Sequence, residues 1–317
     1  MNKELIIAMY HYVRDMNRSG LPKMRGLDIS DFRKQLDFFE ENFEVVRMEQ
    51  VMDHLEGLSV LPENALLLTF DDGYRDHYDY VLPLLKEHGM QGSFFVPGRV
   101  LRERRMLDAN SIHLLLATAS EDVLFDDLLV LIEDKRADRD LPHLDMLMDE
   151  FLIANRWDGP KTNFIKRILQ WVLPSDVRKE IIDEFLRRYL DADERSLADD
   201  MYMTFDELAE MRNEGMYIGV HGYSHDWMGK MPADEAISEI DASLEILDDL
   251  LDRNRWVMNY PYGNIAPEIF DALKARGCVM GITTEPRTAN VGGEDPLTLP
   301  RWDCNDFPPV SERYLEG

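Results

Sequence analysis

Short apolar runs alternate with amphipathic segments along the first hundred residues. Continuous apolar stretches at 5–13 (LIIAMYHYV), 65–70 (ALLLTF) and 92–97 (GSFFVP) predict buried strands, because each is short and bounded by residues typical of loops. The segment 74–88 has helical periodicity and stops at Gly89. A strand, a helix and a second strand in this order predict parallel pairing, which is typical of α/β sheets and barrels.

The pattern changes between residues 101 and 200, where strand signals disappear and acidic residues become frequent. Apolar residues recur at helical spacing in four segments of this stretch, at 112–116, 123–132, 164–172 and 181–190. A stretch of this length is too long for a loop. We therefore predict an all-helical insertion at 101–200 within a barrel made by residues 1–100 and 201–317.

The α/β pattern resumes after residue 200. A capping-box pair, Thr204 and Glu207, predicts the start of a helix that reaches residue 213. The next strand is predicted at 216–220 and ends at His221. Further elements are expected at 234–252 (helix), 256–260 (strand), 267–276 (helix) and 279–283 (strand). The simplest architecture is an incomplete (β/α) barrel of about seven strands with one helical excursion.

The composition is that of a globular protein with a strongly acidic surface. The chain has 317 residues, of which 45% are hydrophobic, and this is enough for a well-buried core. Acidic residues number 62 and basic residues 35, so the net charge of −27 repels polyanions. We therefore expect neither a nucleic acid nor an anionic membrane surface as partner.

The cysteines and the first residues bear on the cellular compartment. Cys278 and Cys304 are too few for a disulfide framework in a chain of this length. The apolar run at 5–10 is shorter than the core of a signal peptide, and no apolar stretch is long enough to span a membrane. These features predict a cytoplasmic protein without a membrane span.

Two adjacent carboxylates, Asp71 and Asp72, follow the strand predicted at 65–70. The carboxyl ends of strands are where α/β folds place their reactive groups. Neighbouring carboxylates repel each other unless a cation or a proton relieves them, and a divalent metal would do so. The alternative is a turn closed by an Asx hydrogen bond.

Two histidines, His221 and His225, follow another predicted strand. Their spacing of four residues on a helical turn would point both imidazoles the same way, as a zinc site requires. The alternative is two unrelated surface histidines. Together with Asp72 they offer one carboxylate and two ring nitrogens, which leaves coordination positions for water and substrate. We expect a divalent metal, zinc before cobalt, nickel, manganese or iron; the same ligand set also occurs in non-haem iron oxygenases.

Three short motifs carry a resemblance to a known family. They are TFDDG at 69–73, HGYSH at 221–225 and YPYG at 260–263. They are similar to the first three motifs of the polysaccharide deacetylases, the NodB-homology family or carbohydrate esterase family four. The resemblance implies a distorted (β/α)7 barrel, with Asp71 as general base and Asp72, His221 and His225 as metal ligands.

The sequence departs from the family pattern at two positions. The arginine of the third motif, which steadies the catalytic aspartate, is replaced by Asn259, and we expect Arg301 to substitute for it. Arg301 lies in RWDCND, which resembles the fourth motif loosely through Asp303 and Asp306. No histidine follows His225 to serve as the general acid of the fifth motif.

Some relatives have a circularly permuted barrel, in which the strand that bears the acid histidine opens the chain. Residues 5–13 are similar to that strand, so the resemblance implies that His11 is the general acid. The alternative is a core histidine bonded to backbone. The resemblance also implies that the backbone N–H of Tyr262 stabilises the oxyanion.

The function expected from these features is hydrolysis of the N-acetyl group of an amino sugar. The enzyme would be a metal-dependent hydrolase of carbon–nitrogen bonds other than peptide bonds, acting on an N-acetylated sugar or sugar conjugate. A cytoplasmic enzyme suggests a nucleotide-linked or lipid-linked precursor of surface polysaccharide. The alternative is a catalytically inactive sugar-binding or scaffold protein on the same fold, because Asn259 and the missing C-terminal histidine break the family pattern.

Overall fold

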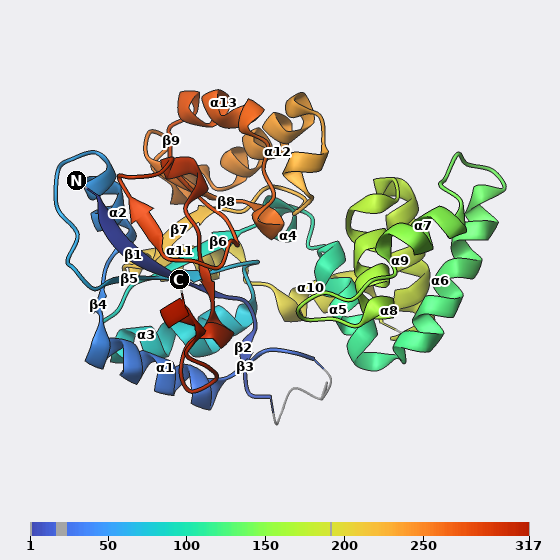
Figure 1. Cartoon of the computed structure of the whole chain (residues 1–317), viewed down its shortest axis with the longest axis horizontal. Helices are drawn as coiled ribbons and strands as arrows, with labels where there is room; N and C mark the ends of the chain where they lie inside the picture. The colour runs from blue at the N-terminus through green and yellow to red at the C-terminus, as the bar shows by residue number, and fades with distance from the viewer. Residues whose placement is uncertain (1, 17–23, 191, 317) are drawn as a thin grey trace. The chain divides into compact units, whose positions relative to one another are not determined.

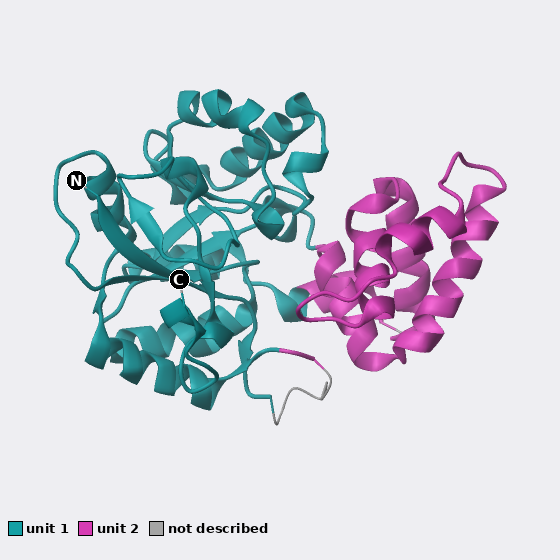
Figure 2. Cartoon of the chain, viewed as in Figure 1, with its two compact units in different colours: residues 1–18, 26–104, 199–317 teal, residues 19–25, 105–198 magenta. Residues whose placement is uncertain are grey.

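The chain folds into two compact units, shown in different colours in Figure 2. The structure is a computed structural model that describes residues 2–16, 24–190 and 192–316. The described residues of unit 1 lie within 1–18, 26–104 and 199–317, and those of unit 2 within 19–25 and 105–198. Each unit has a hydrophobic core of its own.

Unit 1 contains every strand of the described part of the chain (Figure 1). The strands are β1 (Lys3–Tyr10), β2 (Val13–Arg14), β3 (Leu27–Asp28), β4 (Glu44–Val45), β5 (Ala65–Phe70), β6 (Gly92–Val96), β7 (Tyr217–Val220), β8 (Trp256–Asn259), β9 (Cys278–Ile282), β10 (Ala289–Val291) and β11 (Trp302–Asp303). Its α-helices are α1 (Ile29–Asn42), α2 (Met48–Leu55), α3 (Leu82–Glu87), α4 (Gly98–Arg102), α11 (Phe205–Asn213), α12 (Ala233–Ile246) and α13 (Phe270–Ala275).

The centre of unit 1 is a curled parallel sheet in the order β1-β5-β6-β7-β8-β9. All six residues of β5 are buried, as expected for a parallel strand covered on both faces. Helices α1 and α3 lie along one side of the sheet, and α12 and α13 along another (Figure 1). The prediction of an incomplete α/β barrel is confirmed, with the sheet curled into a half-barrel, and the first strand of the chain lies inside the sheet beside β5.

A segment near the C-terminus connects the two ends of this parallel series. Leu299 donates a backbone hydrogen bond to Gly281, within β9 (2.9 Å), and accepts one from Thr283, just after that strand (2.8 Å). A few residues later, β11 pairs in parallel with Ala8 and Met9 of β1. Arg301 lies between these two contacts, so its side chain enters the barrel where the edges of the sheet approach each other.

Unit 2 consists of helices in its described part. They are α5 (Asp108–Thr118), α6 (Glu121–Arg136), α7 (Leu144–Phe151), α8 (Pro160–Arg167), α9 (Ser175–Tyr189) and the start of α10 (Glu194–Met201). Phe164 and Phe185 are among the fully buried residues of its core, together with Ile112 and Leu128. The all-helical insertion is confirmed as part of the fold. No helix in the described residues of either unit is long and apolar enough to cross a membrane.

Two of the predicted helices differ in detail. The helix predicted over 74–88 begins with a π-helical turn (His77–Val81) and becomes α-helical only at α3. Pro83 explains the break, because proline has no amide hydrogen for the regular ladder. The helix predicted over 234–252 ends at Ile246, followed by a separate 3₁₀ turn. Strand β10 was not predicted.

Candidate active site

Four parallel strands deliver the candidate residues to one edge of the sheet. His11 follows β1, the pair Asp71–Asp72 follows β5, His221 follows β7, and Asn259 is the last residue of β8. The carboxyl ends of parallel strands meet at the same edge, so these residues come together from distant parts of the sequence.

Asp72, His221 and His225 form a buried cluster with the geometry of a metal site. One ligand atom from each lies within 4.8 Å of the others. The Nε2 atoms of His221 and His225 lie 3.3 Å and 3.2 Å from Oδ1 of Asp72. The other carboxylate oxygen, Oδ2, accepts a hydrogen bond from the hydroxyl of Tyr74. The Tyr74 contact therefore leaves Oδ1 to face the two imidazoles.

The two histidines do not stand on a helical turn, so that part of the prediction is wrong. They lie on a loop in which Gly222 has φ of 69° and His225 has φ of 63°. Their rings still meet, with centroids 4.8 Å apart and planes inclined by 68°. The left-handed backbone angles of Gly222 and His225 turn the chain back towards Asp72. They bring the two imidazoles together, which a helical turn had been expected to do.

The hydrogen bond on the far side of the His221 ring fixes its tautomer. Nδ1 lies 2.7 Å from the backbone oxygen of Asn259, and a carbonyl can only accept, so Nδ1 carries the proton in the neutral ring. Nε2 then presents a lone pair to Oδ1 of Asp72, which is also an acceptor. Both atoms are buried without a hydrogen-bond partner among the described residues. Two buried acceptors that face each other repel unless a cation or proton lies between them, so the residues fit a metal ion.

Asp71 lies beside this cluster in a separate network of charge and hydrogen bonds. Both terminal nitrogens of Arg301 donate to it, one to each carboxylate oxygen, at 2.9 Å. The side-chain amide of Asn259 donates to Oδ1 of Asp71 at 2.6 Å, and its oxygen accepts from Arg301 at 2.9 Å. Arg301 thus makes the contact with Asp71 that was expected of it in place of an arginine at position 259. Asn259 is linked to Asp71 by its side chain and to His221 by its backbone.

The surroundings keep both carboxylates ionised. Burial raises the pKa of Asp71, but the charge of Arg301, with smaller contributions from His11 and His221, outweighs it and holds the pKa below its usual value. Burial likewise opposes ionisation of Asp72, yet the charge of His225 and the contacts with both imidazoles hold its pKa well below the ordinary value. Asp71 is therefore present as a carboxylate at neutral pH, as a base must be.

His11 reaches the same centre from the first strand. Its Nε2 lies 3.8 Å from Oδ2 of Asp71, and 41% of its side chain is exposed. The alternative of a buried core histidine therefore does not describe it. Its backbone oxygen accepts a hydrogen bond of 2.7 Å from Nε2 of His77, a fully buried ring whose pKa is lowered to about 4 by burial. At neutral pH His77 is uncharged and can donate from Nε2.

Tyr262, in the third motif, lies beside the metal-site cluster. Its φ of 58° is in the left-handed region, and its ring centroid lies 4.7 Å from that of His225. The ring of Trp227 stacks on that of Tyr262, with centroids 4.7 Å apart and planes inclined by 18°. Among the described non-glycine residues, positive φ occurs at Arg104 and at three residues of this centre, namely Asp72, His225 and Tyr262. Such strain is typical of functional sites.

Three contributors were not expected from the sequence. Thr69 accepts a hydrogen bond from Arg301 (3.1 Å), Tyr74 donates to Asp72, and His77 holds the backbone beside His11. Thr69 could have been noticed, because it is the single polar residue of an otherwise apolar strand. The other two lie just after TFDDG and carry no signal of their own.

Comparisons with known proteins agree with this arrangement. A family model described as polysaccharide deacetylase matches residues 59–116 and 187–281. The chain is 18% identical over 288 residues to YxkH of Bacillus subtilis (strain 168), a match that covers 90% of this chain and 67% of that protein. It is 40% identical over 82 residues to the poly-beta-1,6-N-acetyl-D-glucosamine N-deacetylase of Escherichia coli (strain K12), which covers 26% of this chain but only 12% of that enzyme.

Solved structures with the same fold include two that match almost the whole chain. The deacetylase PplD of Streptococcus pyogenes, solved in complex with acetate, superimposes with a TM-score of 0.61 at 16% identity, covering 100% of this chain and 98% of that one. IcaB from Ammonifex degensii gives a TM-score of 0.57 at 17% identity, covering 97% and 95%. At such identities the likeness shows the fold. With the matching family model and the three sequence motifs, it leads to one conclusion: the chain belongs to the polysaccharide deacetylase family.

Proposed function

We propose that this protein is a metal-dependent deacetylase that hydrolyses the N-acetyl group of an amino sugar in a polysaccharide or its precursor. The observation that carries the proposal is the buried pair of acceptors, Oδ1 of Asp72 and Nε2 of His221, 3.3 Å apart. A cation between them relieves their repulsion, and His225 completes a set of three protein ligands. A divalent cation at this place supplies Lewis acidity and lowers the pKa of a water towards about 7. We favour zinc, with cobalt, nickel, manganese and iron as alternatives.

Asp71 is the base in this proposal, and its neighbours prepare it for that role. Arg301 and Asn259 donate to its oxygens, which fixes the plane of the carboxylate and keeps it ionised. The carboxylate takes the proton from water as the water oxygen attacks the acetamide carbonyl. The backbone N–H of Tyr262 stabilises the oxyanion that develops there.

His11 is the acid that completes the reaction. It lies beside Asp71, with Nε2 3.8 Å from Oδ2, and its partial exposure leaves room for a substrate. When the carbon–nitrogen bond breaks, the imidazolium donates its proton to the leaving amine, and the products are acetate and a free amino sugar. The alternative of an inactive protein rested on Asn259 in place of an arginine and on the lack of a histidine after His225. In this proposal Arg301 serves in place of that arginine, and His11 in place of that histidine. Their placement therefore favours an enzyme over a sugar-binding scaffold.

The substrate proposal rests on the family and its relatives. An N-acetylated polysaccharide is what the family implies, and one matched relative is named for poly-beta-1,6-N-acetyl-D-glucosamine. We therefore place β-1,6-linked N-acetylglucosamine oligomers first, followed by β-1,4-linked oligomers and nucleotide-linked N-acetyl sugars.

The experiment is acetate release from this panel under anaerobic conditions. The protein is stripped with a chelator and reloaded with each of the five metals in turn. We expect acetate from at least one substrate, dependent on metal and independent of oxygen. Release that needs dioxygen would point to the oxygenase alternative. No release above that of the stripped protein on any substrate, with metal bound, would favour the scaffold.

A further inference from the structure

The loop that carries both metal-binding histidines is held by a carboxylate from another element. Oε2 of Glu239, on α12, accepts hydrogen bonds from the backbone N–H groups of Tyr223 (3.1 Å) and Ser224 (2.7 Å). These two residues lie between His221 and His225. One side-chain oxygen thus satisfies two backbone donors of the loop at once.

The same loop is fixed on its carbonyl side by the start of α4. The backbone N–H groups of Gly98 and Arg99 donate to the carbonyl oxygens of Gly222 (3.0 Å) and Tyr223 (2.9 Å). A Cβ at position 98 would lie only 2.8 Å from Cδ2 of Tyr223, so the close approach requires glycine. The loop is thus bonded through its amides on one side and its carbonyls on the other.

This arrangement matters because the loop conformation is strained. Gly222 and His225 both have left-handed backbone angles, and at His225, which is not a glycine, such an angle costs about 1–3 kcal/mol. Strained residues persist only where surrounding contacts determine them. Without the Glu239 contact, two backbone amides of the loop lose their acceptor, and the loop is held less firmly in this conformation.

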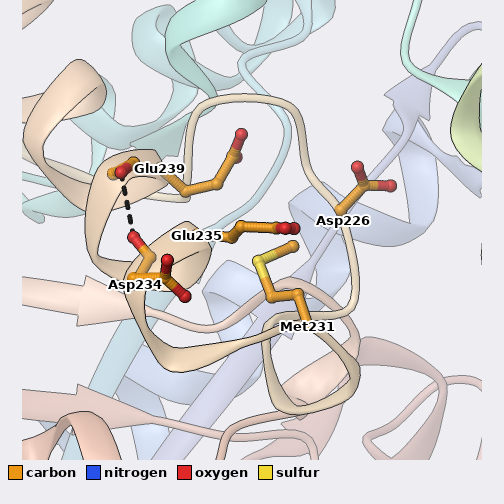
Figure 3. A pocket seen from close by; sticks show the side chains of 6 residues that line it. Asp226, Met231, Asp234, Glu235 and Glu239 are labelled. Carbon is orange, nitrogen blue, oxygen red and sulfur yellow. Dashed lines mark hydrogen bonds between the residues drawn. The ribbon is translucent and has the colours of Figure 1, made fainter.

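We propose that Glu239 is a positioning residue that holds the His221–His225 loop in its metal-binding conformation. The inference rests on the proposed metal-dependent function. It assigns no ligand role to Glu239, whose carboxylate is directed to the backbone of the loop. The acidic hollow that Glu239 lines with Asp226, Asp234 and Glu235 is shown in Figure 3. It provides matched control positions but is not itself offered as a site.

The test compares Zn²⁺ affinity in stripped full-length protein, measured by competition with a chromophoric chelator. Glu239→Asp keeps the charge but withdraws the oxygen by one methylene, whereas Glu239→Gln loses the charge but keeps an acceptor of the same length. For a positioning role we expect Glu239→Asp and Glu239→Ala to weaken binding by about tenfold or more. Glu239→Gln should stay within about threefold of the wild type, because its amide oxygen can still accept from both N–H groups.

Glu235→Ala is the matched control, since it removes an acidic side chain from the same helix and hollow. It should bind zinc like the wild type. If Glu239→Ala fails to fold, as judged by circular dichroism, the Asp and Gln variants still decide the matter.

Equal affinity of Glu239→Asp and wild type would overturn the inference. So would the reverse order, with Gln weak and Asp native, because that order indicates a long-range charge effect. Loss of one of two bound ions would make Glu239 a ligand and also refute it. If the wild type binds neither zinc nor any of the other four metals, the proposed function itself is refuted.

Discussion

Arg301 and Asp71 form a fully buried, bidentate ion pair, with both N–O distances at 2.9 Å. A buried pair of this kind adds little net stability over apolar residues, but removal of one partner leaves an uncompensated charge. The stability that comes from the ionised form of Asp71 is fully present above the pKa of an unfolded aspartate, about 3.9. It is lost as the pH falls through the lowered pKa of folded Asp71.

The first prediction follows from this pair. Arg301→Met should lower the free energy of unfolding at pH 7 by about 3–5 kcal/mol, measured by urea denaturation. The pKa of Asp71 should rise, so the acid limb of kcat/KM should move to higher pH. In the double variant Arg301→Met/Asp71→Asn no charge is left buried, and much of the lost stability should return. Wild-type stability of the single variant would contradict the account.

Replacement of the base should separate chemistry from metal binding. Asp71→Asn keeps the size of the side chain and removes its ability to take a proton, so kcat should fall about 10²–10⁴-fold. Zinc affinity should change by less than about tenfold, because Asp71 is not among the three ligands. Acetate release and metal content, measured on the same preparation, check both halves. His221→Ala is the comparison in which metal binding itself is expected to fail.

The role of His11 can be tested through the leaving group. An amide needs protonation of its departing nitrogen, whereas an aryl acetate leaves as a stable phenolate. His11→Ala should therefore lose about 10²–10⁴-fold in kcat/KM on the N-acetyl sugar but far less on an aryl acetate. Equal losses on both substrates would mean that His11 does not act as the acid.

His77 predicts a pH-dependent component of stability. Its folded pKa is about 4, against an ordinary value of 6.5, so between these values the unfolded chain binds a proton that the folded protein does not. The free energy of unfolding should therefore fall as the pH drops from about 6.5 to about 4, by up to about 3 kcal/mol. His77→Gln can still donate to the His11 backbone but does not titrate. Its urea midpoint should lose this part of the pH dependence, and an unchanged profile would rule the attribution out.

The strands that position the centre could be predicted because each combines an apolar run with clear boundaries. The strand over 65–70 was predicted with its observed limits, and the capping box at Thr204 was correct. Parallel order then brings residues after β1, β5 and β7 to one edge, whatever their separation in sequence. That reasoning needs only strand type and direction.

The contacts within the centre could not be read in the same way. The position of Arg301 depends on a short segment that pairs with both β9 and β1, and such a segment has too few residues for a periodic signal. The His221–His225 loop depends on left-handed backbone angles at two residues. Only at Gly222 does the residue type indicate such an angle, because glycine adopts it readily. The spacing of the two histidines predicted correctly that both rings lie beside Asp72, but it predicted a helical turn where the structure has a loop.

The segment that joins the sheet edges also sets an order in time. Ribosomes make the chain from its N-terminus, so Asp71 is synthesised 230 residues before Arg301. Until then the carboxylate has no guanidinium beside it, and burial of that charge is unfavourable. The nascent protein can collapse around its earlier strands, but in the proposed mechanism Asp71 is prepared as a base only when the segment that carries Arg301 has docked.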